Sequence, residues 1–497
     1  TATGTGTFLY FVIQHIYQTL DAQGQLGAWD DYVGAHLLPR LFGFELLVAP
    51  YAVAHMKLGI ALQDLGYTFR SGQRLGIYLT NTLEAEIKPE ETPLGLAGFI
   101  SQEASAAESV KRTKPIMVVL GNPPYSGHSS NRGDWISNLI RDYYFVDGQP
   151  LGERNPKYLQ DDYVKFIRFG QWRIAQTGEG VLAFITNHGY LDNPTFRGMR
   201  QQLMAAFSDI YILNLHGSSK KREVAPDGSP DQNVFDIQQG VAIGIFVKRG
   251  AQTPPPSPLP ASEEGEQGRG SLARLHYADL WGDREGKYEW LLAHDLTDTP
   301  WQEIAPEAPF YLFVPQDVDL KAEYERGWKV TEALPVNVLG FQTHRDHFAI
   351  DFERERLRER VEEMRDSRLS DEQFRAKYGV QDNRDWQLSA ARSRLRRNDA
   401  WEEDLIDCLY RPFDWRPCYF SEIAMDYPRR ELLTHVFRQD NLCLLSSRQQ
   451  ATAGYRHCWV AQEPANDCVI STTSREANHV FPLYLYPAPN ELLSDSP

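Results

Sequence analysis

The sequence predicts an α/β protein in which a doubly wound, mostly parallel sheet precedes a second, mixed α/β unit. Two observations support the sheet. Short apolar runs typical of buried strands recur along the first part of the chain, and segments with helical periodicity separate them. Strands that alternate with helices form parallel sheets with helices on both faces. The predicted strands are 115–120, 181–187, 209–216 and 241–248, and the predicted helices include 10–20, 48–62, 158–175 and 195–207.

A change in composition divides the chain into two predicted domains, residues 1–315 and 330–497. Within the first, residues 251–270 are rich in Pro, Gly, Ser and Glu, which is typical of a mobile surface loop. Within the second, residues 352–397 alternate acidic and basic side chains at helical spacing, and many of them are arginines. This pattern is typical of an exposed pair of helices with many salt bridges, but arginine also suits phosphates and guanine edges.

Composition bounds the class of protein. The 497 residues are 42% hydrophobic, and no apolar stretch approaches the roughly 20 residues of a membrane span. The five cysteines lack a Cys-x-x-Cys pair, so we expect reduced thiols in a cytoplasmic protein and no metal site. The formal charge of −16 argues against indiscriminate coating of DNA, although a local basic groove is compatible with it. The cysteines are Cys408, Cys418, Cys443, Cys458 and Cys468.

The tetrapeptide Asn122-Pro123-Pro124-Tyr125 directly follows the predicted strand 115–120 and is typical of a strand tip that opens into a site. The Asn122 side-chain oxygen and the Pro123 carbonyl offer two hydrogen-bond acceptors, and the two prolines restrict the backbone that carries them. Such a pair suits a planar amine with a delocalised lone pair, such as that of adenine. Tyr125 offers a flat face on which an extruded base can stack.

This tetrapeptide resembles motif IV of amino-group DNA methyltransferases, above all of the N6-adenine type. The surrounding chain resembles the methyltransferase and specificity portion of type I single-polypeptide (type ISP) restriction-modification enzymes. The resemblance implies a Rossmann-like methyltransferase sheet, S-adenosylmethionine as cofactor, double-stranded DNA as partner, and catalytic roles for Asn122, Pro123, Pro124 and Tyr125. Protein-glutamine N5-methyltransferases also carry Asn-Pro-Pro-Tyr, so the motifs around it are needed to choose between the two classes.

Two further motifs resemble the cofactor-binding motifs of the family. Ala2-Thr3-Gly4-Thr5-Gly6 leads into the predicted helix 10–20, and its glycines let the backbone turn sharply beside a ligand. Glu45 lies before the helix 48–62, where a carboxylate can accept both ribose hydroxyls. The alternative for the glycine motif is an ordinary tight turn. The alternative for Glu45 is a solvated glutamate that the helix dipole favours at a helix start.

Asn81 lies in the strand-like run 77–83, which ends in polar residues, and it matches the family position that hydrogen-bonds the cofactor's adenine amine. Its alternative is an Asx turn that closes the strand. Phe166, on the helix 158–175, resembles the aromatics of the fifth motif, which line the adenine pocket of the cofactor. An aromatic at helical spacing is more often a core residue.

Residues 233–237 (Asn-Val-Phe-Asp-Ile) resemble the eighth motif, in which an aromatic packs on the flipped base, and this places Phe235 opposite Tyr125. The alternative is a hydrophobic anchor at a strand edge. Lys220, Lys221 and Arg222 form a short basic loop that could contact phosphates, although most short charge runs are only solvated. We assign no role to His188 and Arg197, which fit structural positions better than catalytic ones.

Three strings in the C-terminal domain, residues 340–346, 410–416 and 478–484, resemble the type ISP specificity domain, which reads the target sequence in the family. The chain departs from the family at its first residue. It starts with Thr1 inside the glycine motif, without the Asp that usually precedes it, and without the helicase and nuclease parts that the family carries upstream. We therefore expect a fragment without restriction activity, and the sequence does not predict its cofactor affinity.

Together, the motifs predict a site-specific DNA adenine-N6 methyltransferase of a restriction-modification system. Methyl transfer would be a direct displacement, with positioning and hydrogen bonding as the main sources of catalysis. Two alternatives remain: a protein-glutamine N5-methyltransferase, and a DNA specificity module without catalytic activity. Cytosine N4 methylation is a nearer variant, but that group usually carries Ser at the position of Asn122.

Overall fold

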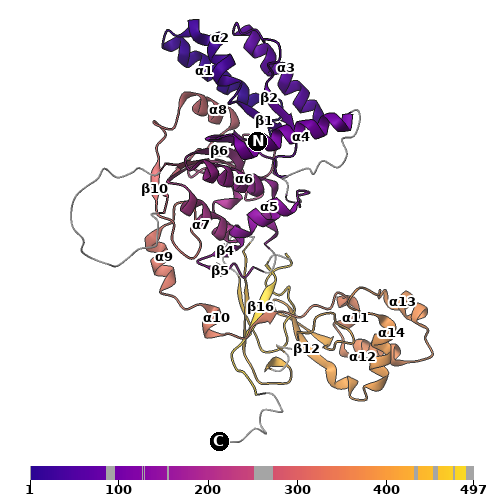
Figure 1. Ribbon diagram of the computed structural model, residues 1–497. Helices are drawn as coiled ribbons and strands as arrows, with labels where there is room; N and C mark the ends of the chain where they lie inside the picture. The colour runs from indigo at the N-terminus through magenta and orange to yellow at the C-terminus, as the bar shows by residue number, and fades with distance from the viewer. Residues whose placement is uncertain are drawn as a thin grey trace, which may run out of the picture. The chain divides into compact units, whose positions relative to one another are not determined.

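The computed structural model divides into two compact units, Thr1–Gln316 and Asp317–Pro497 (Figure 1). It describes residues 2–487 except for 85–95, 126, 128, 154–155, 251–271, 430–431, 433–434, 451–456 and 474–475. The predicted mobile loop 251–270 lies outside the described residues. None of the helices in the described ranges combines the length and apolar character that crossing a bilayer requires.

The first unit contains most of the helices and strands that the sequence predicts, which confirms its α/β class. Its helices are α1 Thr7–Ala22, η1 Leu26–Ala28, α2 Trp29–Tyr32, η2 Val33–Leu37, α3 Val48–Asp64, α4 Leu96–Thr113, α5 Asp134–Leu139, η3 Ile140–Tyr144, η4 Lys157–Gln160, α6 Asp162–Thr177, η5 His188–Tyr190, η6 Pro194–Phe196, α7 Arg197–Ala206 and α8 Arg284–Ala293. Its strands are β1 Phe42–Glu45, β2 Gly76–Leu79, β3 Val118–Gly121, β4 Phe145–Val146, β5 Gln149–Pro150, β6 Gly180–Asn187, β7 Asp209–His216, β8 Val241–Lys248, β9 Arg274–Asp279 and β10 Gln302–Ile304.

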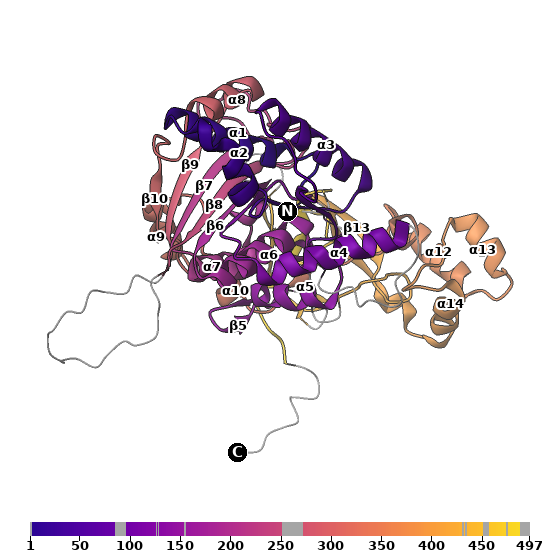
Figure 2. The ribbon, with the colours of Figure 1, turned by 45° about the horizontal axis from the view of Figure 1, so that its top comes forward.

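The main sheet has six strands in the order β10-β9-β7-β8-β6-β3, and Figure 2 shows β9, β7, β8 and β6 side by side. The pairs β3·β6 and β7·β9 are parallel, whereas β8 is antiparallel to both β6 and β7. The sheet is therefore mixed, with β8 as the antiparallel strand at its centre, which agrees with the prediction of a mostly parallel sheet. Residues 217–240, which join β7 to β8, consist of turns, bends and an isolated bridge, so the chain returns without a helical crossover.

Alternation of side chains builds a different core on each face of this sheet. Leu182, Phe184 and Ile212 belong to the large core that contains residues of α6 and α7. Their neighbours Ile185 and Leu213 belong to a second cluster, which contains Trp290 and Leu291 of α8. Because successive strand residues point to opposite faces, these two clusters show that helices cover both faces, as the doubly wound prediction requires.

A smaller parallel sheet pairs β1 with β2, and α1, α2 and α3 form their own core beside it. Helix α1 begins after Gly6, whose φ of 80° lies in the left-handed region. A Cβ at this position would also lie 3.3 Å from the Cβ of Ala54 on α3. The glycine therefore lets the chain turn into α1 close against α3.

The second unit is a mixed α/β structure with a core of its own. A four-stranded sheet has the order β11-β16-β14-β15, and β12 and β13 form an antiparallel hairpin. Its elements are α9 Val318–Glu325, α10 Val330–Ala333, β11 Val338–Leu339, α11 Asp346–Ala349, α12 Arg354–Arg365, α13 Asp371–Tyr378, α14 Leu388–Arg397, η7 Trp401–Asp404, β12 Leu405–Arg411, β13 Asp414–Tyr419, β14 Cys443–Ser447, β15 Cys458–Ala461 and β16 Asn478–Pro482.

Candidate active site

The carboxyl ends of four strands meet at one edge of the six-stranded sheet. Strands β3, β6, β7 and β9 run in the same direction, because β8 is antiparallel to both of its neighbours. The residues that follow these strands, among them Asn122, His188 and Gly217, therefore lie along a single edge, which we call the carboxyl edge. The start of β8 lies at the same edge. Ligands of open α/β sheets bind at such edges.

The predicted catalytic tetrapeptide emerges from β3 at the carboxyl edge. Asn122 and Pro124 are exposed, and Pro123 is buried. The Tyr125 hydroxyl lies 2.8 Å from Asn122 Oδ1 and 3.1 Å from the carbonyl oxygen of Ile185 on β6, so this one hydroxyl faces two acceptors. Burial raises the pKa of the Tyr125 phenol, which therefore stays a donor at neutral pH. The hydroxyl therefore fixes the orientation of the Asn122 amide oxygen, and the Asn122 side chain remains accessible to solvent.

We expect Tyr125→Phe to lower the free energy of unfolding by about 0.5–1.5 kcal/mol, because it removes one hydroxyl that is hydrogen-bonded in the folded protein. The ring, which contacts Tyr163 edge to face at 6.3 Å between centroids, is kept in this variant. Urea unfolding at pH 7 measures the change, and Tyr158→Phe, at an exposed position, is the matched control. Equal stability of the Tyr125 variant and the wild type would show that the hydroxyl does not hold Asn122 in place.

The predicted glycine motif and Glu45 lie together. The Gly4 N–H donates to Glu45 Oε2 at 2.7 Å, and the Leu47 N–H donates to Oε1 at 2.9 Å. Thr3 donates from its backbone N–H and from its hydroxyl to the Phe44 carbonyl, so the first residues lie along β1. Glu45 is buried at the end of β1, directly before α3. The geometry brings Gly4 and Glu45 together, and their contact with a cofactor remains a prediction.

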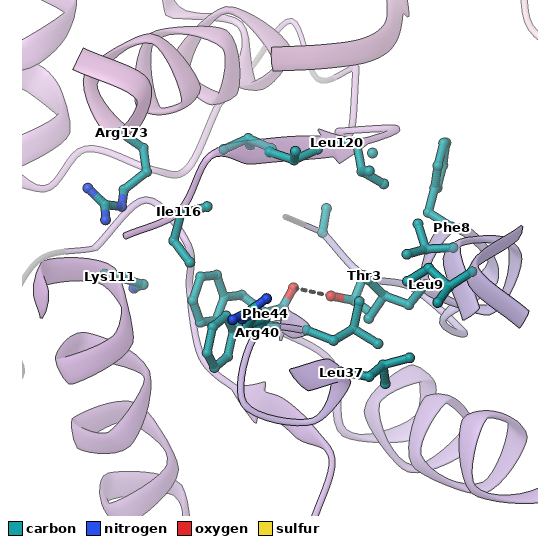
Figure 3. A pocket seen from close by; sticks show the side chains of 18 of the residues that line it. Thr3, Phe8, Leu9, Leu37, Arg40, Phe44, Lys111, Ile116, Leu120 and Arg173 are labelled. Carbon is teal, nitrogen blue, oxygen red and sulfur yellow. Dashed lines mark hydrogen bonds between the residues drawn. The ribbon is translucent and has the colours of Figure 1, made fainter. Parts of the chain in front are cut away.

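A mostly apolar cavity of about 330 Å³ joins this N-terminal segment to β3 (Figure 3). Thr3 and Phe44 line one side, and Leu120, two residues before Asn122, lines another. Lys111 also lines the cavity, and its Nζ donates to the carbonyl oxygens of Asn81 and Glu84. Burial lowers the pKa of Lys111 to about 8. Ala2, the remaining predicted residue of the glycine motif, is part of the same lining.

Asn81 forms the Asx turn that was its alternative interpretation, because its Oδ1 accepts the Leu83 N–H at 3.0 Å. Its Nδ2 also donates to Asn131 Oδ1 at 2.8 Å, and Asn131 in turn donates to Asp162 at the start of α6. Asn81 is thus tied to the segment that follows the tetrapeptide. Phe166 is 6% exposed and lies in the main core, while Phe169 on the same helix lines the cavity.

The other predicted contacts lie near the carboxyl edge. Phe235 is half-buried, and its backbone N–H donates to Asn233 Oδ1 at 2.8 Å. Asn233 Nδ2 also donates to the Gly217 carbonyl at 3.0 Å, which ties the Phe235 segment to the end of β7. The predicted phosphate contacts Lys220, Lys221 and Arg222 are all exposed, and Lys221 pairs with Asp192 at 2.6 Å.

Several polar residues of the carboxyl edge were not predicted as site residues. His188, His216, Glu223 and Asp279 line a cavity of about 360 Å³ at this edge. The signal that could have found them is that each histidine lies at the end of a buried strand, where polar side chains reach the site. A fully buried ion pair between Asp231 and Lys287, at 2.7 Å, lies beside them.

The arginine-rich stretch 352–397 of the second unit forms three helices, α12, α13 and α14, in place of the predicted pair. Many of its arginines are paired with acids, as the salt-bridge interpretation predicts. Arg392 is 2% exposed and pairs with Asp371 at 2.7 Å, and Arg358 pairs with Glu402 at 2.8 Å. A DNA-facing role for these helices remains a prediction. In the strings predicted to mark this unit, Phe341 is buried in the core and Tyr410 donates to Asp346 at 2.9 Å.

Comparisons with known proteins agree with this architecture. Residues 332–496 match the family model of the Type ISP C-terminal specificity domain. The chain resembles the Type ISP enzymes. One solved structure with a similar fold is the ATP-dependent Type ISP restriction-modification enzyme LlaBIII bound to DNA, at 22% identity and a TM-score of 0.59 over 97% of this chain and 31% of that chain.

A second Type ISP structure is a nuclease-deletion mutant of LlaGI in complex with a DNA substrate mimic, at 20% identity and a TM-score of 0.61 over 97% of this chain and 38% of that chain. A DrdV–DNA complex matches at 21% identity and a TM-score of 0.58, over 98% of this chain and 46% of that chain. This Type ISP-like chain thus spans less than half the length of these relatives. The matches confirm the predicted fold, and no curated protein sequence matches the chain.

Proposed function

We propose that the chain is a site-specific DNA adenine-N6 methyltransferase of a restriction-modification system. One observation carries the proposal. The exposed Asn122 side chain accepts a hydrogen bond from the Tyr125 hydroxyl and lies at the end of β3. Strand β3 lines the same cavity as the N-terminal segment, in which the Gly4 N–H donates to Glu45. The residues directly before the amine acceptor, Leu120 and Gly121, and Ala2 and Thr3 of the predicted cofactor motif thus border the same cavity. The type ISP relatives solved with DNA and the specificity-domain match support DNA as the partner.

The residues of the carboxyl edge suit this chemistry. The Asn122 oxygen and the Pro123 carbonyl would accept from the adenine amine and draw electron density toward its nitrogen, because each acceptor stabilises the positive charge that develops there. Tyr125 and Phe235 would pack on the extruded base, which offsets an unstacking cost of a few kcal/mol. Positioning then supplies most of the catalysis, and no covalent bond between protein and substrate is needed.

S-adenosylmethionine would supply an electrophilic methyl group on a sulfonium centre. The residues present suit it. Glu45 is a buried carboxylate at a strand end, and its two oxygens accept backbone N–H groups of Gly4 and Leu47, which fixes its position beside the glycine motif. Ala2, Thr3, Gly4 and Gly6 would approach the cofactor closely with their backbone. Asn81 would recognise the adenine amine of the cofactor, and Phe166 would support that pocket from the core.

We expect Glu45→Gln to weaken binding of S-adenosylmethionine by about tenfold or more. The amide has one acceptor oxygen in place of two, so it cannot accept from Gly4 and Leu47 together and also from a ribose hydroxyl. Isothermal titration with S-adenosylmethionine measures the affinity. Glu179→Gln, which changes an acid at the far end of β6, is the control. Unchanged affinity in the Glu45 variant would remove this residue from the cofactor site.

Methylation-sensitive sequencing of DNA, from cells that express the protein as its gene encodes it, tests the proposed function. We expect N6-methyladenine at one recurring sequence and none in cells without the gene. Absence of that mark, together with specific DNA binding in a gel shift, would favour a DNA specificity module without catalytic activity. Absence of DNA binding together with methylation of a protein glutamine would favour the second alternative. We also propose that the protein is cytoplasmic and that nuclease and helicase domains are part of the same parent polypeptide.

A further inference from the structure

Three unassigned side chains converge at the carboxyl edge. His188 follows β6, His216 ends β7, and Glu223 lies in the loop after β7. The two histidines are 5% and 6% exposed. Glu223 Oε1 lies 3.9 Å from His188 Nε2 and 3.8 Å from His216 Nδ1, and the possible ligand atoms of all three residues lie within 4.8 Å of one another. We call these residues the His-His-Glu cluster.

The outer nitrogen of each imidazole already has an acceptor. His188 Nδ1 lies 3.1 Å from Asn214 Oδ1. That oxygen also accepts the backbone N–H of His216, and Asn214 Nδ2 donates to the Tyr277 hydroxyl. Both contacts agree with the assignment of the Asn214 oxygen as the acceptor that faces His188. His216 Nε2 lies 2.7 Å from a carboxylate oxygen of Asp279, and a carboxylate oxygen is an acceptor. Each outer nitrogen therefore carries the proton, and each inner nitrogen of a neutral ring presents a lone pair.

The inner atoms of the cluster are thus three acceptors that face one another. Distances of 3.8–3.9 Å are too long for hydrogen bonds, and His216 Nδ1 is buried without a hydrogen-bond partner among the described residues. The other oxygen of Glu223 accepts the Ser218 N–H at 2.7 Å, which holds Oε1 toward the histidines. A buried acceptor without a donor is costly, and the Glu223 carboxylate lies 3.8 Å from His216 Nδ1, so the arrangement favours a cation between them.

We propose that the His-His-Glu cluster binds a divalent transition-metal ion of the Zn²⁺ class. Two imidazole nitrogens and one carboxylate oxygen are ligands that Zn²⁺ takes at about 2.0–2.2 Å. In a tetrahedral site such bonds hold the ligand atoms about 3.3–3.6 Å apart, so the three side chains would draw closer together on binding. Asn214 and Asp279 hold the outer nitrogens in the way that second partners of metal-bound histidines do. Imidazole nitrogens argue against Ca²⁺ and Mg²⁺, which prefer oxygen.

The local charge favours a dication. Glu223, Asp279 and Asp192 all line the adjoining cavity of about 360 Å³, and Lys221, the one lysine in this lining, pairs with Asp192. Three protein ligands leave a fourth position for a water molecule, for which the cavity has room. The ion ties the ends of β6 and β7 to the loop that carries Lys220, Lys221 and Arg222, and so orders this basic loop. Metal binding itself does not depend on the proposed methyltransferase function.

The test uses the full chain after treatment with EDTA and dialysis. We expect one Zn²⁺ per chain by isothermal titration with zinc chloride, a tetrahedral visible spectrum on addition of Co²⁺, and a rise in melting temperature with Zn²⁺ that EDTA reverses. We expect Glu223→Gln to weaken Zn²⁺ binding by more than about 100-fold, and Asp279→Asn, which acts through His216, to weaken it by about 10–100-fold. The exposed Glu285→Gln is the matched control and should bind as the wild type does.

Failure to bind one Zn²⁺ per chain, or wild-type affinity in both Glu223→Gln and Asp279→Asn, overturns the proposal. If Glu223→Gln does not fold, the Zn²⁺ affinity of Asp279→Asn decides whether the proposal holds, because this variant leaves all three proposed ligands in place. A cluster stabilised only by a proton would gain stability as the pH falls, without any response to Zn²⁺ or EDTA, and this result also overturns the proposal. None of these measurements uses methyl transfer, so they remain decisive if the chain proves not to be a methyltransferase.

Discussion

We expect Asn122→Ala to reduce methyl transfer by at least about 10²–10³-fold, the loss seen when one preorganised polar group of an active site is removed. The side chain is exposed, and its only hydrogen-bond partner among the described residues is the Tyr125 hydroxyl, so its removal should cost little stability. Incorporation of labelled methyl groups into DNA, at saturating S-adenosylmethionine, measures the rate. Gel-shift affinity for the same DNA should stay within a few-fold of the wild type.

Asn138→Ala is the matched control, because Asn138 is an exposed asparagine on α5 of the same unit. It should transfer methyl groups at the wild-type rate. Retained turnover in Asn122→Ala would contradict the proposed polarisation of the amine. A loss of DNA binding in parallel with turnover would instead assign Asn122 to substrate binding.

Lys287→Met should destabilise the first unit by about 3–5 kcal/mol, because it leaves a buried carboxylate without its counter-charge. Neither side chain of the Asp231–Lys287 pair is exposed. Lys287 Nζ also donates to the carbonyl oxygens of Leu215 and Gln232, and Asp231 accepts the Gly217 N–H at 2.6 Å. The pair thus joins α8 to the end of β7. Urea unfolding at pH 7 measures the change in the free energy of unfolding.

The double variant Asp231→Asn with Lys287→Met should recover part of this loss, because it removes the uncompensated charge while it keeps one acceptor for the backbone. Lys114→Met, at an exposed position, should change stability by less than about 0.5 kcal/mol. Equal stability of Lys287→Met and the wild type would mean that water reaches Asp231 and that the pair does not organise this edge.

Local patterns in the sequence predict much of this fold. The strands predicted at 181–187, 209–216 and 241–248 are confirmed almost to the residue, because each is a mostly apolar run between polar turns. The direction of β8 could not be predicted in this way. A strand with apolar residues on both faces shows the same pattern whether it lies parallel or antiparallel to its neighbours. The choice depends on the connection, and residues 217–240 have no periodicity that indicates one.

Prediction of the candidate site was more uneven. The proximity of Gly4 and Glu45 was implied by the family motifs, and the structure shows a hydrogen bond between them. The contact of Tyr125 with the Ile185 carbonyl could not be foreseen, because it depends on the pairing of β3 with β6. The His-His-Glu cluster was missed for a related reason. Its members come from two strand ends and a loop, and their spacing in the sequence forms no known ligand motif.

The position of β8 also affects how the protein folds while it is being synthesised. This strand fills the place between β6 and β7, although both are synthesised before it. Until residues 241–248 leave the ribosome, β6 and β7 each expose an apolar edge with unpaired backbone groups, which is a template for aggregation. Nascent chains that stop before residue 241 should therefore depend on chaperones, whereas those that include β8 can close the centre of the sheet.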